Sequence, residues 1–214
     1  MKPRLLDLFC GAGGAAMGYH RAGFEVVGVD IAPQPHYPFE FHQGDARTWP
    51  LDGFDAIHAS PPCQAYSTMG NRYRIPHPEL LQEVLTWFYG VTIPLIVENV
   101  PGAKRLMPGA IRLTGGMFGL RVHRPRLFLS NVPLQAPPPS PPPPDRIGVY
   151  GNAPDGRRLW GPPKAPTLVA AKGLKEAQEA MGMDWADWYG TKEAIPPAYT
   201  EYIGKQLLTY LEGR

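Results

Sequence analysis

The 214-residue chain is poor in cysteine and has no long apolar segment. Its two cysteines, Cys10 and Cys63, are too few for a disulfide framework or a cysteine-rich metal site, so each is interpreted from its neighbours. No apolar run approaches the ~20 residues that span a bilayer, and residues 1–11 enter a strand pattern without the layout of a signal peptide. We therefore expect a cytoplasmic protein with no membrane partner and no metal.

Carboxylates are scarce in the middle of the chain. Residues 56–175 carry 14 basic and 5 acidic side chains, and no carboxylate lies between Glu98 and Asp145. The flanking parts are acidic, which reduces the formal net charge of the whole chain to +2. A basic block of this kind suits a polyanion such as nucleic acid, although a solvated surface stretch is the alternative.

Proline and glycine are in excess, with 27 and 24 residues respectively. Eight of the twelve residues in 133–144 are proline, which favours a stiff connector over a ligand for a recognition domain. The apolar fraction of 43% still requires a core. We therefore predict one main domain formed by residues 1–130 and 173–214, with residues 131–172 as a proline-rich linker and a short insert.

Strand and helix signals alternate in the first hundred residues. Strands are expected at residues 4–9, 25–30, 39–42, 54–60, 93–98 and 126–130, with weaker signals at 147–150 and 167–170. Helices are expected from residue 15 to Gly23 and at residues 78–90, 174–182 and 197–211. Alternating βα units predict an α/β fold with a doubly wound, mostly parallel sheet covered by helices on both faces.

A glycine-rich turn, DLFCGAGG at residues 7–14, ends the first strand and opens the first helix. Ligands of open α/β sheets lie beyond the carboxyl ends of the strands, and glycines let the backbone approach them closely. Asp30 ends the second strand, where its carboxylate could accept hydrogen bonds from two ribose hydroxyls. Asp45 follows the third strand, where it could meet an adenine amino group. No Lys-Ser/Thr pair follows the glycines, which disfavours a P-loop; a structural turn with incidental acids is the alternative.

The segment SPPCQAYS, residues 60–67, follows the fourth expected strand. Two prolines fix its backbone and could present the thiol of Cys63 beyond the sheet edge. No acid occurs in residues 56–78, and a basic surround favours the nucleophilic thiolate. A buried, inert cysteine is the usual alternative, but the prolines and the position over the ligand cleft favour a functional thiol.

Two further groups are expected at the same edge of the sheet. Glu98 ends the fifth strand, and its carboxyl group could act as an acid if burial raises its pKa. Arg124 and Arg126 precede the sixth strand, where two-residue spacing places both side chains on one side of an extended chain. They could bind a carbonyl oxygen and a phosphate or hold Glu98 in position, although surface ion pairs are the alternative.

The segments DLFCGAGG, PPCQ, ENV and RPR occur in an order that resembles the C5-cytosine DNA methyltransferases. The resemblance covers roughly residues 4–130 and 173–210, including GLKEAQEAMGMDW and the stretch from Ala194 to Gly204. It implies a Rossmann-like fold that binds S-adenosylmethionine. It also implies methylation of cytosine at C5, on a base that is flipped out of the DNA duplex. By position it implies three site groups: Cys63 as nucleophile; Glu98, Arg124 and Arg126 as partners of the base; and Phe9, Gly11, Gly13, Asp30, Asp45 and Pro61 as cofactor-binding residues.

Three positions depart from the family's pattern. Val122 replaces a glutamine, and Lys192-Glu193 replaces a Gly-Asn pair near the cofactor's amino-acid end. Only about 42 residues, 131–172, stand where the family carries a target-recognition domain. The short segment leaves three alternatives open. The protein could perform the same chemistry on RNA or on a free nucleotide, it could transfer a different group, or it could be a non-catalytic subunit. A partner protein or an oligomer could supply the missing recognition surface.

Overall fold

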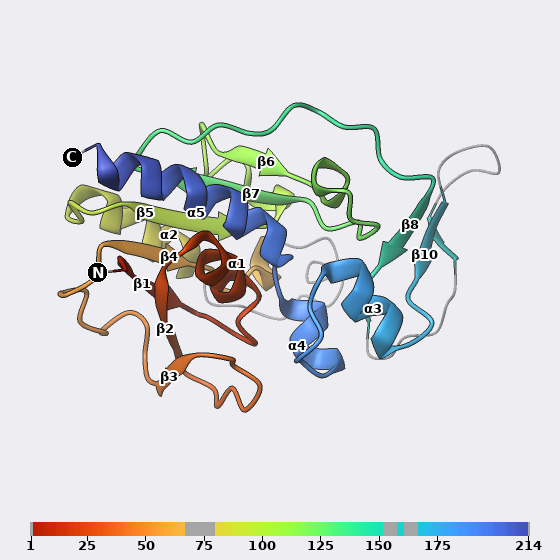
Figure 1. Cartoon of the computed structure of the whole chain (residues 1–214), viewed down its shortest axis with the longest axis horizontal. Coiled ribbons are helices and arrows are strands. Elements are labelled where there is room, and N and C mark those ends of the chain that lie inside the picture. The colour runs from red at the N-terminus through yellow and green to blue at the C-terminus, as the bar shows by residue number, and fades with distance from the viewer. Residues whose placement is uncertain (1, 67–79, 152–157, 161–166, 214) are drawn as a thin grey trace.

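The computed structural model describes residues 2–66, 80–151, 158–160 and 167–213. Its main sheet has the strand order β3-β2-β1-β4-β5-β7-β6 (Figure 1). Strands β1 to β5 pair in parallel, whereas β7 runs antiparallel to both β5 and β6. The strands are β1 Arg4–Leu8, β2 Glu25–Asp30, β3 Glu40–Gln43, β4 Ala56–Ala59, β5 Leu95–Asn99, β6 Ile111–Leu113 and β7 Arg126–Ser130. The predicted mostly parallel α/β sheet is confirmed, and β6 is an additional strand.

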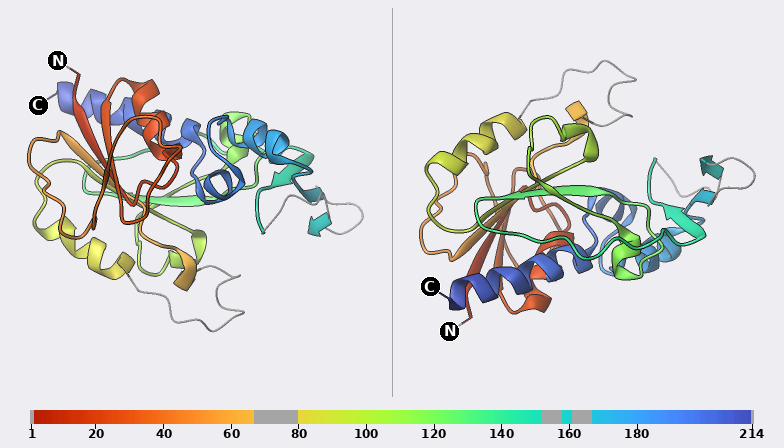
Figure 2. Two further views of the ribbon diagram at one scale, coloured as in Figure 1. Left: turned by 90° about the horizontal axis from the view of Figure 1, so that it is seen from below. Right: turned by 90° about the horizontal axis from the view of Figure 1, so that it is seen from above.

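Helices cover both faces of this sheet, as the two views in Figure 2 show. Helices α1 (Gly14–Ala22) and α5 (Pro197–Glu212) lie on one face, and α2 (Leu80–Thr86) lies on the other. Strands buried on both faces need near-continuous apolar sequence, which explains why the central strands lack polar alternation. None of the helices in the described part of the chain is both long and apolar enough to cross a membrane.

Helix α2 departs from the expected helix at residues 78–90. Its expected start at residue 78 lies outside the described residues. Its end comes earlier than expected, because the α-helix stops at Thr86 and a 3₁₀ turn, Trp87–Tyr89, follows.

A second, three-stranded sheet lies beside the main one. It has the order β8-β10-β9, formed by Asp145–Gly148, Thr167–Ala170 and Arg158–Trp160. The weak strand signals at residues 147–150 and 167–170 therefore mark real strands. Residues from β8 share a hydrophobic cluster with α3 (Leu174–Met181) and α4 (Trp188–Glu193), a helix that the sequence did not indicate.

The proline-rich tract connects the two sheets without forming a helix or strand. In Figure 1 it passes above β6 and β7 on its way to β8. The amide nitrogen of Gln135 donates to Oε1 of Gln206 at 2.9 Å, and Nε2 of Gln206 donates back to the Gln135 carbonyl at 3.1 Å. The start of the tract is thus fixed to α5.

Close packing of α1 against α5 depends on two small residues. A Cβ atom at Gly18 would lie 2.0 Å from Oγ1 of Thr200 and 2.2 Å from the carbonyl oxygen of Pro197. A Cβ atom at Gly204 would lie 2.7 Å from the side chain of Ala22. The two helices can therefore approach this closely only with glycine at these positions, and they hold the glycine-rich turn that precedes α1.

We predict that Gly18→Ala lowers the free energy of unfolding by about 1–3 kcal/mol, because the added methyl group overlaps backbone atoms that cannot move independently. Urea unfolding followed by circular dichroism measures the change. Gly90→Ala is the matched control, because its φ is −120° and an added Cβ meets nothing within 4 Å. Equal midpoints for the two variants would contradict the prediction.

Candidate active site

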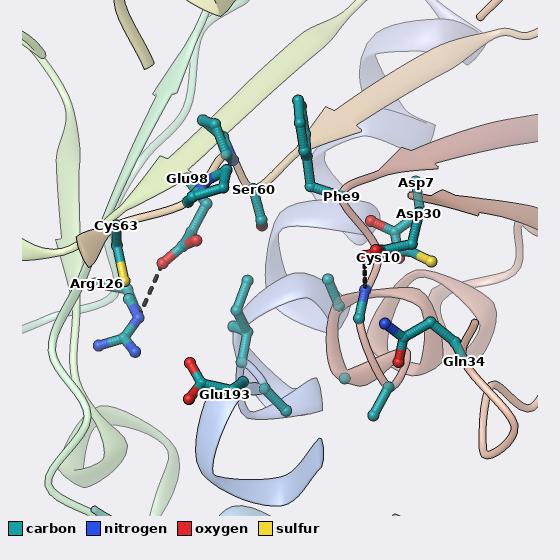
Figure 3. Close-up of a pocket in the computed structure, with 18 of the residues that line it drawn as sticks. Asp7, Phe9, Cys10, Asp30, Gln34, Ser60, Cys63, Glu98, Arg126 and Glu193 are labelled. Atoms are coloured by element: carbon teal, nitrogen blue, oxygen red, sulfur yellow. Dashed lines mark hydrogen bonds and ion pairs between the residues drawn. The ribbon is translucent and has the colours of Figure 1, made fainter. Parts of the chain in front are cut away.

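The carboxyl ends of β1, β2, β4 and β5 surround a cavity of about 300 Å³. This volume is at the lower limit of small-molecule sites. Figure 3 shows two groups of side chains around it, one containing Cys63, Glu98 and Arg126 and the other containing Phe9 and Asp30. Seven of the ten residues predicted from the sequence line the cavity: Phe9, Gly11, Asp30, Pro61, Cys63, Glu98 and Arg126. Gly13, Asp45 and Arg124 are absent from its lining.

The glycine-rich turn forms one wall. The amide of Gly11 donates to Oδ2 of Asp30 at 3.0 Å, and the amide of Ala32 donates to Oδ1 at 3.0 Å. Both bonds fix the carboxylate while leaving lone pairs on each oxygen for a ligand. Gly11 has a φ of +49°, and a Cβ there would meet nothing within 4 Å. Phe9, with a φ of +57°, is a non-glycine residue in the left-handed region, a conformation that concentrates at functional sites.

Asp7 is a cavity residue that sequence reasoning did not single out. It is fully buried, and burial raises the pKa of its carboxyl group well above the usual range. The hydroxyl of Tyr37 donates to its Oδ2 at 3.4 Å, but Oδ1 has no hydrogen-bond partner within the described residues. A charged residue inside an apolar strand was the signal that could have identified it.

Cys63 is half-buried at the opposite wall. The turn that carries it is held by Asn99, whose Nδ2 donates to the carbonyl of Pro61 at 3.1 Å. Burial raises the pKa of the Cys63 thiol, and the Glu98 carboxylate raises it further, whereas Arg126 lowers it. The expectation that a basic surround would favour the thiolate is therefore wrong, because desolvation and the nearby acid outweigh the cation.

Glu98 and Arg126 form a buried ion pair. Nε of Arg126 lies 2.9 Å from Oε1 of Glu98, and the side chains are only 11% and 7% exposed respectively. Burial raises the pKa of Glu98, opposed by Arg126 and by a hydrogen bond from Ser60, so the expected direction is confirmed. Within the described residues, Oε1 is buried and faces Nε of Arg126 without an aligned hydrogen bond.

Arg124 lies away from the cavity. Its guanidinium group donates to three backbone carbonyls, those of Ala194 (2.9 Å), Val149 (3.3 Å) and Lys192. Burial lowers its pKa to about 10. The two arginines thus do not act as a pair: Arg126 holds Glu98, whereas Arg124 joins the segment after β8 to the end of α4.

Gly13 and Asp45 also make contacts outside the cavity. A Cβ atom at Gly13 would lie 2.7 Å from Pro38 and 3.0 Å from Tyr37, so this glycine permits close backbone packing. Asp45 binds Arg47, with 2.5 Å between Oδ2 and Nη2. Hydrogen bonds from Arg47 lower the pKa of Asp45 to about 2.

Carboxyl groups dominate the polar lining of the cavity. Asp30 and Glu193 line it together with Asp7 and Glu98, two groups whose pKa is raised by burial, and Arg126 supplies a guanidinium. Glu193 stands where the sequence departs from the family's Gly-Asn pair, and Figure 3 shows its carboxylate pointing to the side of Arg126.

We predict that iodoacetamide alkylates Cys63 more slowly at pH 8 than a free cysteine, because only the thiolate reacts and the pKa of this thiol is raised. Arg126→Gln should slow the reaction further by removing a positive charge, and Glu98→Gln should accelerate it. Peptide mass spectrometry identifies the labelled cysteine. Lys104→Gln, which removes an exposed cation, is the control. Faster alkylation of Arg126→Gln would refute the assignment of charges.

Known proteins resemble this chain in sequence and in fold. Residues 3–104 match the family model of the C-5 cytosine-specific DNA methylases. None of the curated protein sequences matches the chain.

Solved methyltransferase structures share the whole fold. A candidate DNA modification methyltransferase encoded within an E. coli prophage has a TM-score of 0.65 at 16% identity, with 100% of both chains covered. The S. pombe Dnmt2 methyltransferase has a TM-score of 0.67 at 14% identity, and the Entamoeba histolytica methyltransferase EhMeth 0.66 at 12%; each comparison covers 99% of both chains. The resemblance drawn from the sequence is therefore confirmed: over residues 3–104, this chain matches the C-5 cytosine-specific DNA methylase family.

Proposed function

We propose that this protein is a DNA (cytosine-5-)-methyltransferase that uses S-adenosylmethionine and forms a covalent bond between Cys63 and C6 of the target base. The observation that carries the proposal is that Cys63, Glu98 and Arg126 share one cavity with Phe9, Gly11 and Asp30. A nucleophile, an acid and a cofactor-binding wall are thereby within reach of a single bound base.

The cofactor would occupy the wall formed by the glycine-rich turn. Asp30 would accept hydrogen bonds from the ribose hydroxyls, and the open side of Gly11 would admit close approach. The bound cofactor supplies an electrophilic methyl group on its sulfonium. Pro61 lines the same cavity and would contact it. Gly13 and Asp45 remain predicted cofactor residues; Asp45 could reach an adenine only after releasing Arg47.

Cytosine C5 is a poor nucleophile, and the wall that contains Cys63 and Glu98 would make it more nucleophilic. The thiolate of Cys63 adds its electron pair to C6 while Glu98 delivers a proton to N3, which makes C5 enamine-like. C5 then takes the methyl group, and a base removes the C5 proton. Elimination across C5–C6 frees the thiolate, and N3 returns its proton to Glu98. Burial raises the pKa of Glu98, which suits an acid of this kind.

Arg126 would act on the O2 side of the base while it holds Glu98. Arg124, although predicted as a site residue, would support the site through backbone carbonyls. C6 of a stacked base is inaccessible to a thiol in a cavity, so the target cytosine has to be flipped out of the helix.

The proposed substrate is DNA because residues 3–104 match the family model of DNA methylases, and the basic residues 56–175 suit a phosphate backbone. In this proposal residues 1–130 and 173–214 form the catalytic domain, and residues 131–172 form a minimal recognition insert. A target-recognition partner would be a second chain or another copy of this one. Cytoplasmic location and a role in restriction-modification remain expectations.

We predict that duplex DNA containing 5-fluorocytosine traps a covalent adduct in the presence of S-adenosylmethionine, because fluorine cannot leave C5 as a proton does. Denaturing gels and peptide mass spectrometry should find the adduct on Cys63 and not on Cys10. Cys63→Ala should form none. Absence of an adduct on every DNA tested, or full methylation by Cys63→Ala, would refute the proposed function.

A second candidate is the same chemistry on RNA or on a free cytosine nucleotide, or with another transferred group. The short insert favours it, because about 42 residues offer little surface for reading duplex sequence. We predict that label transfer from S-adenosylmethionine is greatest onto duplex DNA among duplex DNA, single strands, tRNA and dCMP. Greater transfer onto tRNA or dCMP would favour the second candidate. A non-catalytic subunit is disfavoured because Cys63, Glu98 and Arg126 are all retained.

A further inference from the structure

A row of buried polar side chains lies beneath the cavity and has no part in the proposed chemistry. Tyr19 of α1 and His58 of β4 are both fully buried. The hydroxyl of Tyr19 lies 2.9 Å from Nδ1 of His58, and Nε2 of His58 lies 2.8 Å from Oγ of Ser60. Three polar groups in an otherwise apolar layer are costly unless each hydrogen bond is satisfied.

The row ends at Glu98. Strands β4 and β5 pair in parallel with Ala59 opposite Val97, so the next residues, Ser60 and Glu98, are neighbours across the two strands. His58 and Ser60 are two residues apart and therefore face the same side of the sheet. The hydroxyl of Ser60 donates a hydrogen bond to the Glu98 carboxyl group, and both residues line the cavity.

The direction of each hydrogen bond follows from Tyr19, the end of the row that is farthest from Glu98. Burial lowers the pKa of His58 to about 3, so the imidazole is neutral near pH 7 and has one donor and one acceptor nitrogen. Within the described residues, the Tyr19 hydroxyl makes its one hydrogen bond to Nδ1. Its proton would be unsatisfied unless Nδ1 accepts it. The remaining ring proton then lies on Nε2 and is donated to Ser60, whose own proton is directed at Glu98.

We propose that Tyr19, His58 and Ser60 are positioning residues that together deliver one hydrogen-bond donor to the Glu98 carboxyl group from beneath the cavity. The inference rests on the proposed function, in which Glu98 gives a proton to the cytosine. Ser60 donates to one carboxyl oxygen, and Nε of Arg126 lies 2.9 Å from Oε1. The row and the ion pair together fix the orientation of the carboxyl group.

The first test uses the free protein and needs no substrate. Long-range ¹H–¹⁵N NMR of the imidazole should show His58 as the Nε2–H tautomer from pH 5 to 8, in the native chain. An Nδ1–H tautomer, or a protonated ring in this range, would overturn the proposal. This result is independent of whether the protein methylates anything.

The second test measures the titration of Glu98 by ¹³C NMR of its carboxyl carbon. Ser60→Ala should move the midpoint to higher pH, because the charged carboxylate loses a donor. Tyr19→Phe should move it in the same direction by less, because His58 can then adopt either tautomer. The other ionisable groups around Glu98 are unchanged in both variants: Arg126, Arg124, Cys63 and Tyr199.

Tyr199→Phe is the matched control. Tyr199 is also fully buried, and its hydroxyl donates one hydrogen bond of 2.8 Å, to the carbonyl of Arg124. It should leave the Glu98 midpoint unchanged. An unchanged midpoint in Ser60→Ala, or equal shifts in Tyr19→Phe and Tyr199→Phe, would overturn the proposal.

Methyl transfer provides the last readout. If protonated Glu98 is the working acid, the pH at which kcat falls should rise in Ser60→Ala and in Tyr19→Phe, a change that a purely structural role would not cause. A shifted Glu98 midpoint without any methyl transfer by the native protein would refute the proposed function and leave the hydrogen-bonded row intact. A shifted midpoint with an unshifted kcat profile would overturn the positioning role.

Discussion

The buried ion pair between Glu98 and Arg126 depends on the one reversal of direction in the main sheet. Glu98 lies at the carboxyl end of β5, where a parallel neighbour would place its own carboxyl end. Strand β7 is antiparallel instead, with Asn99 opposite Leu127, so its first residue, Arg126, reaches the same edge. A carboxyl group buried at this point needs a cation and hydrogen-bond donors to offset its desolvation. The antiparallel strand supplies the cation, and β4 supplies Ser60.

Glu98 also lowers the reactivity of the neighbouring Cys63 thiol. The negative charge of Glu98 and burial both raise the pKa of the Cys63 thiol, so the resting thiol is less reactive than an exposed one. A bound cation or a proton on Glu98 would remove part of this effect. In the proposed mechanism Glu98 gives up its proton as Cys63 forms the bond to C6, so the two changes of charge have to occur together within one cavity.

Much of the fold and of the site follows from the positions of strand ends. An apolar run that stops at Asp30 or Glu98 predicts both a strand and a polar residue at the ligand edge, and both residues line the cavity. Strand β6 has only three residues and depends on pairing with β7, so no local pattern reveals it. Helix α4 begins at a capping residue, Asp187, but its six residues are too few for a periodic signal.

Side-chain partners were harder to predict than strands. Two-residue spacing places Arg124 and Arg126 on one side, but it cannot show that Arg124 meets carbonyls some 70 residues later in the chain. Burial of Cys63 likewise outweighs the basic sequence around it. The contact between Tyr19 and His58 joins residues 39 apart and depends on how α1 lies on the sheet. Such contacts come from tertiary packing, which local sequence does not specify.

Arg124 connects the insert to the cavity. Its guanidinium group holds the carbonyl of Val149, just after β8, together with those of Lys192 and Ala194, beside the cavity residue Glu193. Arg126, two residues along the same segment, holds Glu98. The segment that carries both arginines therefore joins the stretch after β8 to Glu98 and to the carbonyls on either side of Glu193. A change in the position of β8 would reach the cavity through these hydrogen bonds, because Arg124 and Arg126 are only two residues apart.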